Sequence, residues 1–154
     1  MKIRDVMTTN VRTCFTSDSL AAAAQLMWDH DCGCVTVLNE EGRVVGMLTD
    51  RDICMAAFFQ RVPIGEIKVS AVMSRQLFDC TADDALSGAE SIMRKGKVRR
   101  LPVLNKDGRL VGLLSLSDIA RLAYDEYEGK AANRYVSDVE VAGLVADVSR
   151  RRRD

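Results

Sequence analysis

Apolar residues recur along this chain at helix and strand spacing, in one order that is written twice. The first helical stripe recurs at i, i+3, i+4 and i+7, as expected of a helix with one buried face. Its members are Leu20, Ala23, Ala24 and Met27. The second stripe has the same register and consists of Leu86, Ala89 and Met93. Residues of helix N-cap type precede both stripes, so we expect the caps at Ser17-Asp18 and Asp83-Asp84.

Strand-like runs surround each of these helices. A brief extended piece precedes each helix, and a hairpin with an Asn and a Gly in its turn follows it. The extended pieces lie at 13–15 and 79–81, and the hairpin strands at 35–38, 43–48, 101–104 and 109–114. Further helices are predicted at about 50–59 and 116–127. The fold class is therefore α+β, with the order β-α-β-β-α in each copy.

The two copies align without a gap at an offset of 66 residues. Residues 3–57 lie on residues 69–123, and 18 of these 55 positions are identical. Two copies of one half-core can pair about a pseudo-twofold axis and leave two related clefts, where ligands bind. The predicted domains are repeat 1 at 1–60, a linker at 61–68, repeat 2 at 69–127, and a helix with a basic tail at 128–154.

The chain after the second repeat predicts one more helix. Ser137-x-x-Glu140 resembles a capping box. An apolar stripe follows, made of Val141, Leu144, Val145 and Val148. We expect an amphipathic helix that packs on the repeats or on a partner, with Arg150–Arg153 complementing its C-terminal end.

Composition places the chain among ordinary globular proteins. Hydrophobic residues make up 47% and charged residues 29% of its 154 residues, and the net charge is zero. No broad attraction to nucleic acid or to an anionic membrane is therefore expected. Without a membrane-length apolar stretch or a signal peptide, the chain is predicted to be cytoplasmic. Five cysteines without regular spacing do not indicate a disulfide framework.

The segment that closes each hairpin has the residues best suited to binding a ligand. Residues 46–52 read Gly-x-x-Thr-x-x-Asp, and residues 112–118 read Gly-x-x-Ser-x-x-Asp. A hydroxyl and the backbone N–H groups at a helix start attract phosphate. A carboxylate accepts the paired hydroxyls of a ribose. The alternative is purely structural, because the same hydroxyl and carboxylate can form a helix capping box.

These motifs together resemble a tandem pair of cystathionine-β-synthase (CBS) domains, a Bateman module. The resemblance covers about residues 1–124 and also rests on three shorter segments, Val6-Met7-Thr8, Val72-Met73-Ser74 and Arg99-Arg100-Leu101-Pro102-Val103. It implies a non-enzymatic regulatory module without a catalytic cofactor. Such a module binds AMP, ADP, ATP, NAD or S-adenosylmethionine in clefts between the repeats, and it signals occupancy to a regulated protein.

The resemblance also implies which residues hold the ligand. Asp52 and Asp118 would bind the riboses of two clefts, and Thr49 and Ser115 would face the phosphates. Each cleft would be completed by the other repeat. The completing residues are Arg99, Arg100 and Pro102 for Asp52, and Gly33, Cys34 and Thr36 for Asp118.

This assignment predicts two unequal clefts. Arg99-Arg100 bring two guanidinium groups, which bind phosphate oxygens well, whereas the first repeat has Gly33-Cys34 at the same place. Arg51 is a further phosphate candidate. We therefore expect the Asp52 cleft to take phosphorylated adenosine, and the Asp118 cleft to bind more weakly or to take a less anionic ligand.

Two other functions stay open at this point. One is an interaction scaffold of the same fold without a ligand. The other is a thiol or zinc sensor that uses Cys32 and Cys34, with His30 and Asp31 nearby. The sequence contains no Ser/His/Asp set and no P-loop that would indicate an enzyme. By resemblance a homodimer is expected through helical residues, with Met55, Phe58, Phe59, Leu122 and Tyr124 as candidates.

Overall fold

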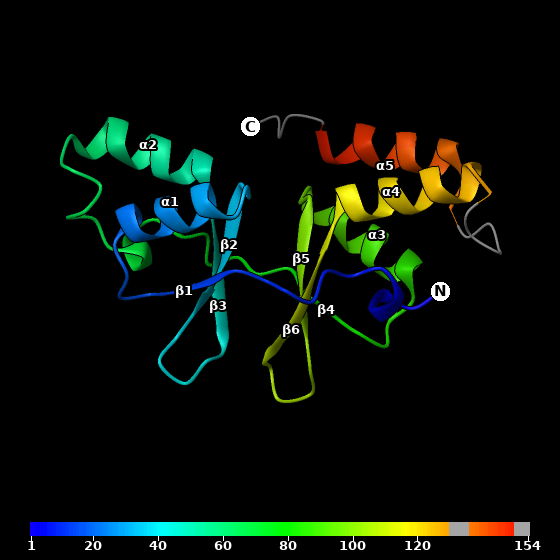
Figure 1. The fold of residues 1–154 in the computed structure, drawn as a ribbon, viewed down its shortest axis with the longest axis horizontal. Coiled ribbons are helices and arrows are strands. Elements are labelled where there is room, and N and C mark those ends of the chain that lie inside the picture. Colours follow the sequence, from blue (N-terminus) through cyan, green and yellow to red (C-terminus); the bar gives the residue numbers. More distant parts are fainter. Residues whose placement is uncertain (130–135, 150–154) are drawn as a thin grey trace. The chain divides into compact units, whose positions relative to one another are not determined.

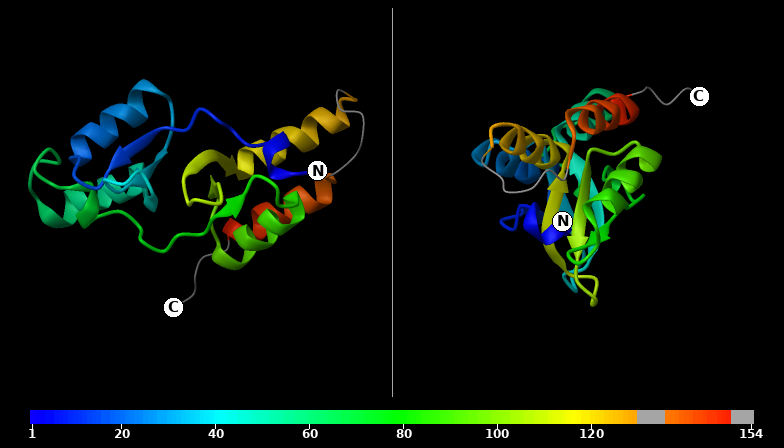
Figure 2. Two further views of the ribbon diagram at one scale, coloured as in Figure 1. Left: turned by 90° about the horizontal axis from the view of Figure 1, so that it is seen from below. Right: turned by 90° about the vertical axis from the view of Figure 1, so that its right-hand side faces the viewer.

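The computed structural model describes residues 1–129 and 136–149, and the chain forms two compact units. One unit consists of residues 11–77. The other combines residues 1–10 with the chain from Phe78 onward. Figures 1 and 2 show the helices and strands of both units.

The unit of residues 11–77 is a three-stranded sheet with helices on one of its faces (Figure 1). Strand β2 lies in the centre, parallel to β1 and antiparallel to β3. Its elements are β1 (Thr13–Phe15), α1 (Leu20–Asp29), β2 (Cys34–Leu38), β3 (Val44–Thr49), α2 (Asp50–Gln60) and a 3-10 turn at Val69–Ala71. The predicted β-α-β-β-α order is confirmed.

The second unit repeats this topology and adds one helix. Strand β5 lies between β4 and β6 in the same orientations. The elements are a 3-10 turn at Ile3–Asp5, β4 (Cys80–Thr81), α3 (Leu86–Gly96), β5 (Arg100–Leu104), β6 (Leu110–Ser115), α4 (Leu116–Tyr127) and α5 (Asp138–Ser149). The expected C-terminal helix is thus present, and the predicted Arg150–Arg153 tail lies outside the described residues.

The two sheets differ where a proline stands in a central strand. In the first unit the N–H of Thr36 donates to the carbonyl of Arg12 (3.2 Å), which lies just before β1. Pro102 occupies the matching position of β5 and has no N–H to donate. Strand β4 is accordingly only two residues long, whereas β1 has three.

The helix caps lie one to two residues later than the sequence indicated. Ser19 caps α1 by accepting the N–H of Ala22 (3.2 Å), and Ala85 begins α3 without a side-chain cap. The expected caps Ser17-Asp18 and Asp83-Asp84 were therefore wrong. Asp18 instead accepts the N–H of Phe15 (2.7 Å), and Asp84 accepts that of Thr81 in the same way. Because each aspartate closes the turn that leaves a strand, it is not available to the helix start.

Helix α5 packs on α3 and α4 through the predicted apolar stripe. Leu144 and Val148 are buried in one core with Met93 and Ile119. The pair of helices α3 and α5 is also joined by an ion pair between Arg94 and Asp147 (2.8 Å). Among the described residues, no helix has the length and apolar content needed to cross a membrane.

Candidate functional site

Asp52 and Asp118, which end the two Gly-x-x-Thr/Ser-x-x-Asp motifs, lie where a strand runs directly into a helix. At the junction of β3 and α2, the N–H and hydroxyl of Thr49 both donate to Oδ2 of Asp52, at 2.9 and 2.7 Å. The N–H of Asp52 donates back to the hydroxyl of Thr49 (3.2 Å). This is a complete capping box, so the structural interpretation of the motif is confirmed. The capping box uses only Oδ2 of the Asp52 carboxylate, so Oδ1 takes no part in it.

That second oxygen distinguishes the two junctions. Within the described residues, nothing donates a hydrogen bond to Oδ1 of Asp52, and the side chain is half-buried. At the junction of β6 and α4, Ser115 and Asp118 form the same box, but Oδ1 of Asp118 accepts from Arg121 (2.6 Å). Asp118 is only 6% exposed. The Asp52 junction therefore has an acceptor to offer, whereas the Asp118 carboxylate is paired at both oxygens.

Close contacts within the protein explain why glycine stands at the first position of each motif, Gly46 and Gly112. A Cβ on Gly46 would lie 2.6 Å from the carbonyl oxygen of Ser74, because residues 73–74 pair with β3 through Met47. A Cβ on Gly112 would lie 2.5 Å from the sulfur of Met7. The close approach at each glycine is thus made by backbone and side chains of the opening segments, 7–8 and 73–74. The glycines need no ligand to explain them.

The two arginines of the second repeat lie beside Ser115. Arg100 is the strand partner of Ser115, and the carbonyl of Arg99 accepts the N–H of Leu116 at the start of α4 (2.9 Å). A pocket of about 290 Å³ opens there, lined by Arg99, Arg100, Ser115, Leu116, Ser117, Val145 and Ser149. Two guanidinium groups, hydroxyls and a helix N-terminus give this pocket the chemistry of an anion site.

The matching residues of the first repeat surround Thr49. Gly33 accepts the N–H of Asp50 (3.2 Å), and Cys34 is the strand partner of Thr49. Thr36 is fully buried, and its hydroxyl donates to the sulfur of Met47 (3.5 Å).

The remaining candidates differ in exposure. Arg51 is exposed on the first turn of α2, and Pro102 is buried in β5. The predictions that Asp52 meets Arg99, Arg100 and Pro102, and that Asp118 meets Gly33, Cys34 and Thr36, join residues of different units and stay predictions.

The cysteines form no disulfide, and all five lie in the described part of the chain. Cys14 and Cys80 are buried in strands, and burial raises the pKa of these thiols to about 11 and about 12, helped by nearby carboxylates. Over residues 1–129 and 136–149, no three His, Cys, Asp or Glu side chains are grouped to hold a metal ion. The structure thus adds nothing in favour of a zinc sensor at Cys32 and Cys34.

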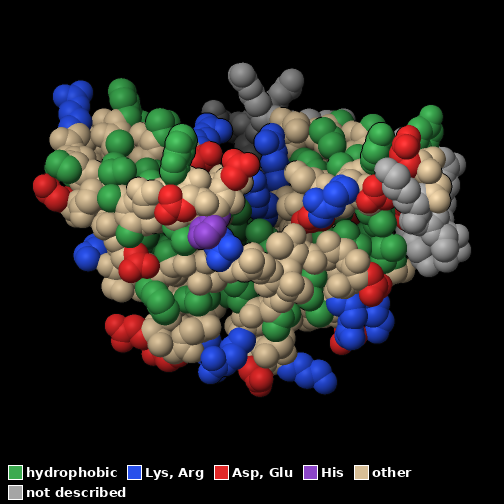
Figure 3. Space-filling model, in the orientation of Figure 1, with side chains coloured by type: hydrophobic (Ala, Val, Ile, Leu, Met, Phe, Trp, Pro, Cys, Tyr) green, Lys and Arg blue, Asp and Glu red, His purple; other side chains and the backbone are tan. Residues whose placement is uncertain are grey.

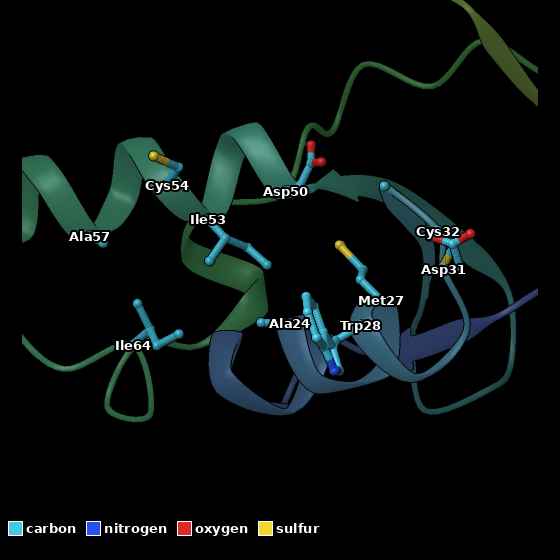
Figure 4. A pocket seen from close by; sticks show the side chains of 11 residues that line it. Ala24, Met27, Trp28, Asp31, Cys32, Asp50, Ile53, Cys54, Ala57 and Ile64 are labelled. Atoms are coloured by element: carbon cyan, nitrogen blue, oxygen red, sulfur yellow. The ribbon is translucent and has the colours of Figure 1, made fainter.

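A second pocket was not foreseen from the sequence. It has a volume of about 580 Å³ and lies between α1 and α2 (Figure 4). The signal that points to it is Trp28, an aromatic residue beside the apolar stripe of α1 that is 85% exposed.

Comparison with known proteins identifies the repeat. Residues 3–58 and 69–125 each match the CBS domain model. The CBS domain-containing protein YhcV of Bacillus subtilis (strain 168) is 37% identical over 118 residues, which cover 77% of this chain and 82% of YhcV. Hypoxic response protein 1 of Mycobacterium tuberculosis is 31% identical over 118 residues, with the same coverage of 77% and 82%.

Solved structures show the same fold. The crystal structure of Hypoxic Response Protein I with two coordinated zinc ions superimposes with a TM-score of 0.71 at 30% identity, over 79% of this chain and 98% of that one. The CBS domain pair of protein MJ0100, in complex with 5′-methylthioadenosine and S-adenosyl-L-methionine, gives a TM-score of 0.72 at 24% identity, over 85% and 98%. The predicted fold of two CBS-type repeats is thereby confirmed.

Proposed function

Because this chain belongs to the CBS domain family, we propose that it is a non-enzymatic regulatory module of the cytoplasm that binds an adenosine-containing compound and signals occupancy to a partner protein. The observation that carries the proposal is the Asp52 junction. A helix N-terminus, a hydroxyl and a half-buried carboxylate with one uncommitted oxygen lie within one turn of chain. The candidate ligands are AMP, ADP, ATP, NAD and S-adenosylmethionine, all of which contain a ribose.

We assign the sugar contact to Asp52. Its capping bonds hold Oδ2, so the side chain is already oriented when Oδ1 accepts a ribose hydroxyl. Such preorganisation lowers the entropic cost of binding. Asp118 is the weaker candidate, because a ribose hydroxyl would compete with the guanidinium of Arg121. This favours the unequal sites expected from the sequence.

We assign the phosphate contact to Arg99 and Arg100, with Arg51 and the hydroxyls of Thr49 and Ser115 as further donors. The polar pocket beside Ser115 supports this choice, because its lining brings positive charge and no carboxylate. A protein of the same fold holds two adenosyl compounds, which supports the ligand class and leaves the compound itself open.

Thermal unfolding in the presence of AMP, ATP, NAD and S-adenosylmethionine tests the proposal. A ligand that binds only the folded state at a hundredfold excess over its Kd stabilises by about 2.7 kcal/mol. For a chain of this size that is a rise in Tm of about 5–11 °C. Asp52→Asn keeps an acceptor for the cap but removes the charge, and the loss of a charged hydrogen bond of about 1.5–3 kcal/mol weakens binding about 10- to 100-fold.

Asp118→Asn is the matched control, since it changes the same motif in the other repeat. It should leave most of the ligand-dependent shift in Tm. A double-mutant cycle between Asp52→Asn and Arg100→Ala then asks whether the two residues serve one ligand. A protein whose Tm responds to none of the four compounds would be better described as a ligand-free scaffold.

The partner assignment includes a second copy of the chain. Met55, Phe58 and Phe59 are exposed on α2, and the rings of Phe58 and Phe59 meet edge to face at 5.1 Å. Exposed aromatic residues of this kind favour an interface. Tyr124 is exposed on α4 as well, whereas Leu122 packs against the core and is the weakest of the dimer candidates. Sedimentation of Phe58→Glu against the unchanged protein tests the homodimer.

A further inference from the structure

The pocket between α1 and α2 is an apolar groove on the unit of residues 11–77. Figure 4 shows Ala24 and Met27 of α1 and Ile53 and Ala57 of α2 along its two sides. Figure 3 shows hydrophobic side chains at the surface over this part of the molecule. The remaining lining residues are Trp28, Asp31, Cys32, Gly33, Asp50, Cys54 and Ile64. We call this surface the α1–α2 groove.

The second unit shows what covers the equivalent groove. An offset of 66 residues carries Met27, Ile53 and Ala57 onto Met93, Ile119 and Ala123. Those three residues are buried in one core with Leu144 and Val148 of α5. Figures 1 and 2 show α5 lying along α3 and α4. One repeat of this chain therefore already uses this groove to hold an amphipathic helix, and over residues 1–129 and 136–149 no helix fills the groove of the other repeat.

The rims of the two grooves carry opposite charge. In the filled groove, Arg94 of α3 pairs with Asp147 of α5 (2.8 Å) and also donates to the carbonyl of Glu140 (3.3 Å). The helix that fits this rim is acidic, since residues 138–149 contain three carboxylates and no basic residue.

The open groove has different residues at the positions that correspond to the rim of the filled groove. Trp28 stands in place of Arg94, Asp31 in place of Lys97, Gly33 in place of Arg99 and Asp50 in place of Leu116. Two carboxylates and an exposed indole replace three basic side chains. An acidic helix such as α5 would be repelled here, whereas a basic side chain would meet Asp31 and Asp50 and stack on the face of Trp28.

We propose that the α1–α2 groove docks an amphipathic helix of a partner protein, with apolar residues at i, i+3 and i+7 and a lysine or arginine near its C-terminal end. The apolar stripe follows Val141, Leu144 and Val148 of α5. The C-terminal position follows from the filled groove, where Val145 and Ser149 lie beside Arg99 and Leu116, the counterparts of Gly33 and Asp50. A basic residue there also complements the helix dipole. The site is separate from the ligand assignment to Asp52.

Two stapled helical peptides test the proposal on the full chain. One has the sequence of residues 138–149, and the other carries Asp147→Arg in the same sequence. Trp28 is the only tryptophan of the chain, so its fluorescence reports directly on the groove. The arginine peptide should bind and shift the Trp28 emission, because its arginine takes the place of Asp147, whose partner Arg94 is replaced by Trp28 in the open groove. The parent peptide should bind at least about tenfold more weakly, because its aspartate loses the Arg94 partner and adds negative charge to an acidic rim.

Three protein variants locate the binding. Ala57→Glu places a charge inside the groove and should abolish binding, whereas Gln60→Glu on the same helix is exposed, lies outside the lining and should not. Trp28→Ala removes an exposed ring without touching the core, and should weaken binding about three- to thirtyfold when fluorescein on the peptide is the probe.

Two results would overturn the proposal. One is equal binding, or no binding, of the two peptides. The other is a Trp28 emission that changes on dilution of the protein alone, because a second copy of the chain would then cover the groove.

Discussion

Replacing Gly46 with alanine tests how closely the opening segment of the second repeat lies on β3. The new Cβ would stand 2.6 Å from the carbonyl oxygen of Ser74 and 3.1 Å from the sulfur of Met73. The first neighbour is a backbone atom that cannot move alone. The segment must shift, and the two hydrogen bonds between Met47 and Ser74, at 3.1 and 2.9 Å, must lengthen or break.

The expected loss of stability follows from these contacts. Two hydrogen bonds contribute about 0.5–1.5 kcal/mol each, and overpacking a tight contact costs about 1–3 kcal/mol. Alanine returns about 0.4–1 kcal/mol by restricting the unfolded chain. The net destabilisation is about 1–6 kcal/mol, or a fall in Tm of roughly 2–24 °C.

Two other glycines provide the controls in a urea titration followed by circular dichroism. Gly112→Ala meets the flexible sulfur of Met7 first and the carbonyl of Thr8 only at 3.1 Å, so it should cost less than Gly46→Ala. Gly88→Ala meets nothing within 4 Å in the exposed first turn of α3, and should stabilise by about 0.5–1 kcal/mol. If Gly46→Ala unfolded at the same urea concentration as the unchanged protein, the close approach would be refuted.

Two further predictions concern titrating groups. Burial raises the pKa of Glu90, and the nearby Glu140 raises it further, so the folded state holds the Glu90 proton more tightly than the unfolded state does. Ionisation of Glu90 therefore costs stability as pH rises through the raised pKa, and Glu90→Gln should gain stability over the unchanged protein at pH ~7 but not at pH ~4, measured by urea unfolding. For the cysteines, iodoacetamide followed by mass spectrometry should modify the exposed Cys54 first. Cys14 and Cys80, with their raised pKa values and burial, should react only after unfolding; rapid labelling of either in folded protein would contradict their placement.

The residue types of the candidate site could be predicted from the sequence, but their hydrogen-bond partners could not. The spacing of Thr49 and Asp52 indicated both a capping box and a sugar contact, and the structure confirms the first. Whether an oxygen is left over depends on neighbours outside the motif. Arg121 lies three residues beyond Asp118 and takes its second oxygen, whereas no described residue does so at Asp52. Such differences arise from side-chain placement, which a spacing pattern does not contain.

The sequence by itself determined the repeat, the β-α-β-β-α order and the helix after it, because the period of apolar residues reports which face of each segment is buried. Only the tertiary structure decided which segments complete which core. Residues 1–10 open the first repeat but belong to the unit of the second, where Thr8 pairs with Leu113, while Ser74 of the second repeat pairs with Met47 of the first. The two openings share a Val-Met pair followed by a hydroxyl residue and fit either sheet by pattern alone, so the choice rests on long-range backbone pairing. The same holds for the α1–α2 groove, since only packing shows that α5 fills the equivalent groove of its own unit, whereas none of the described helices fills this one.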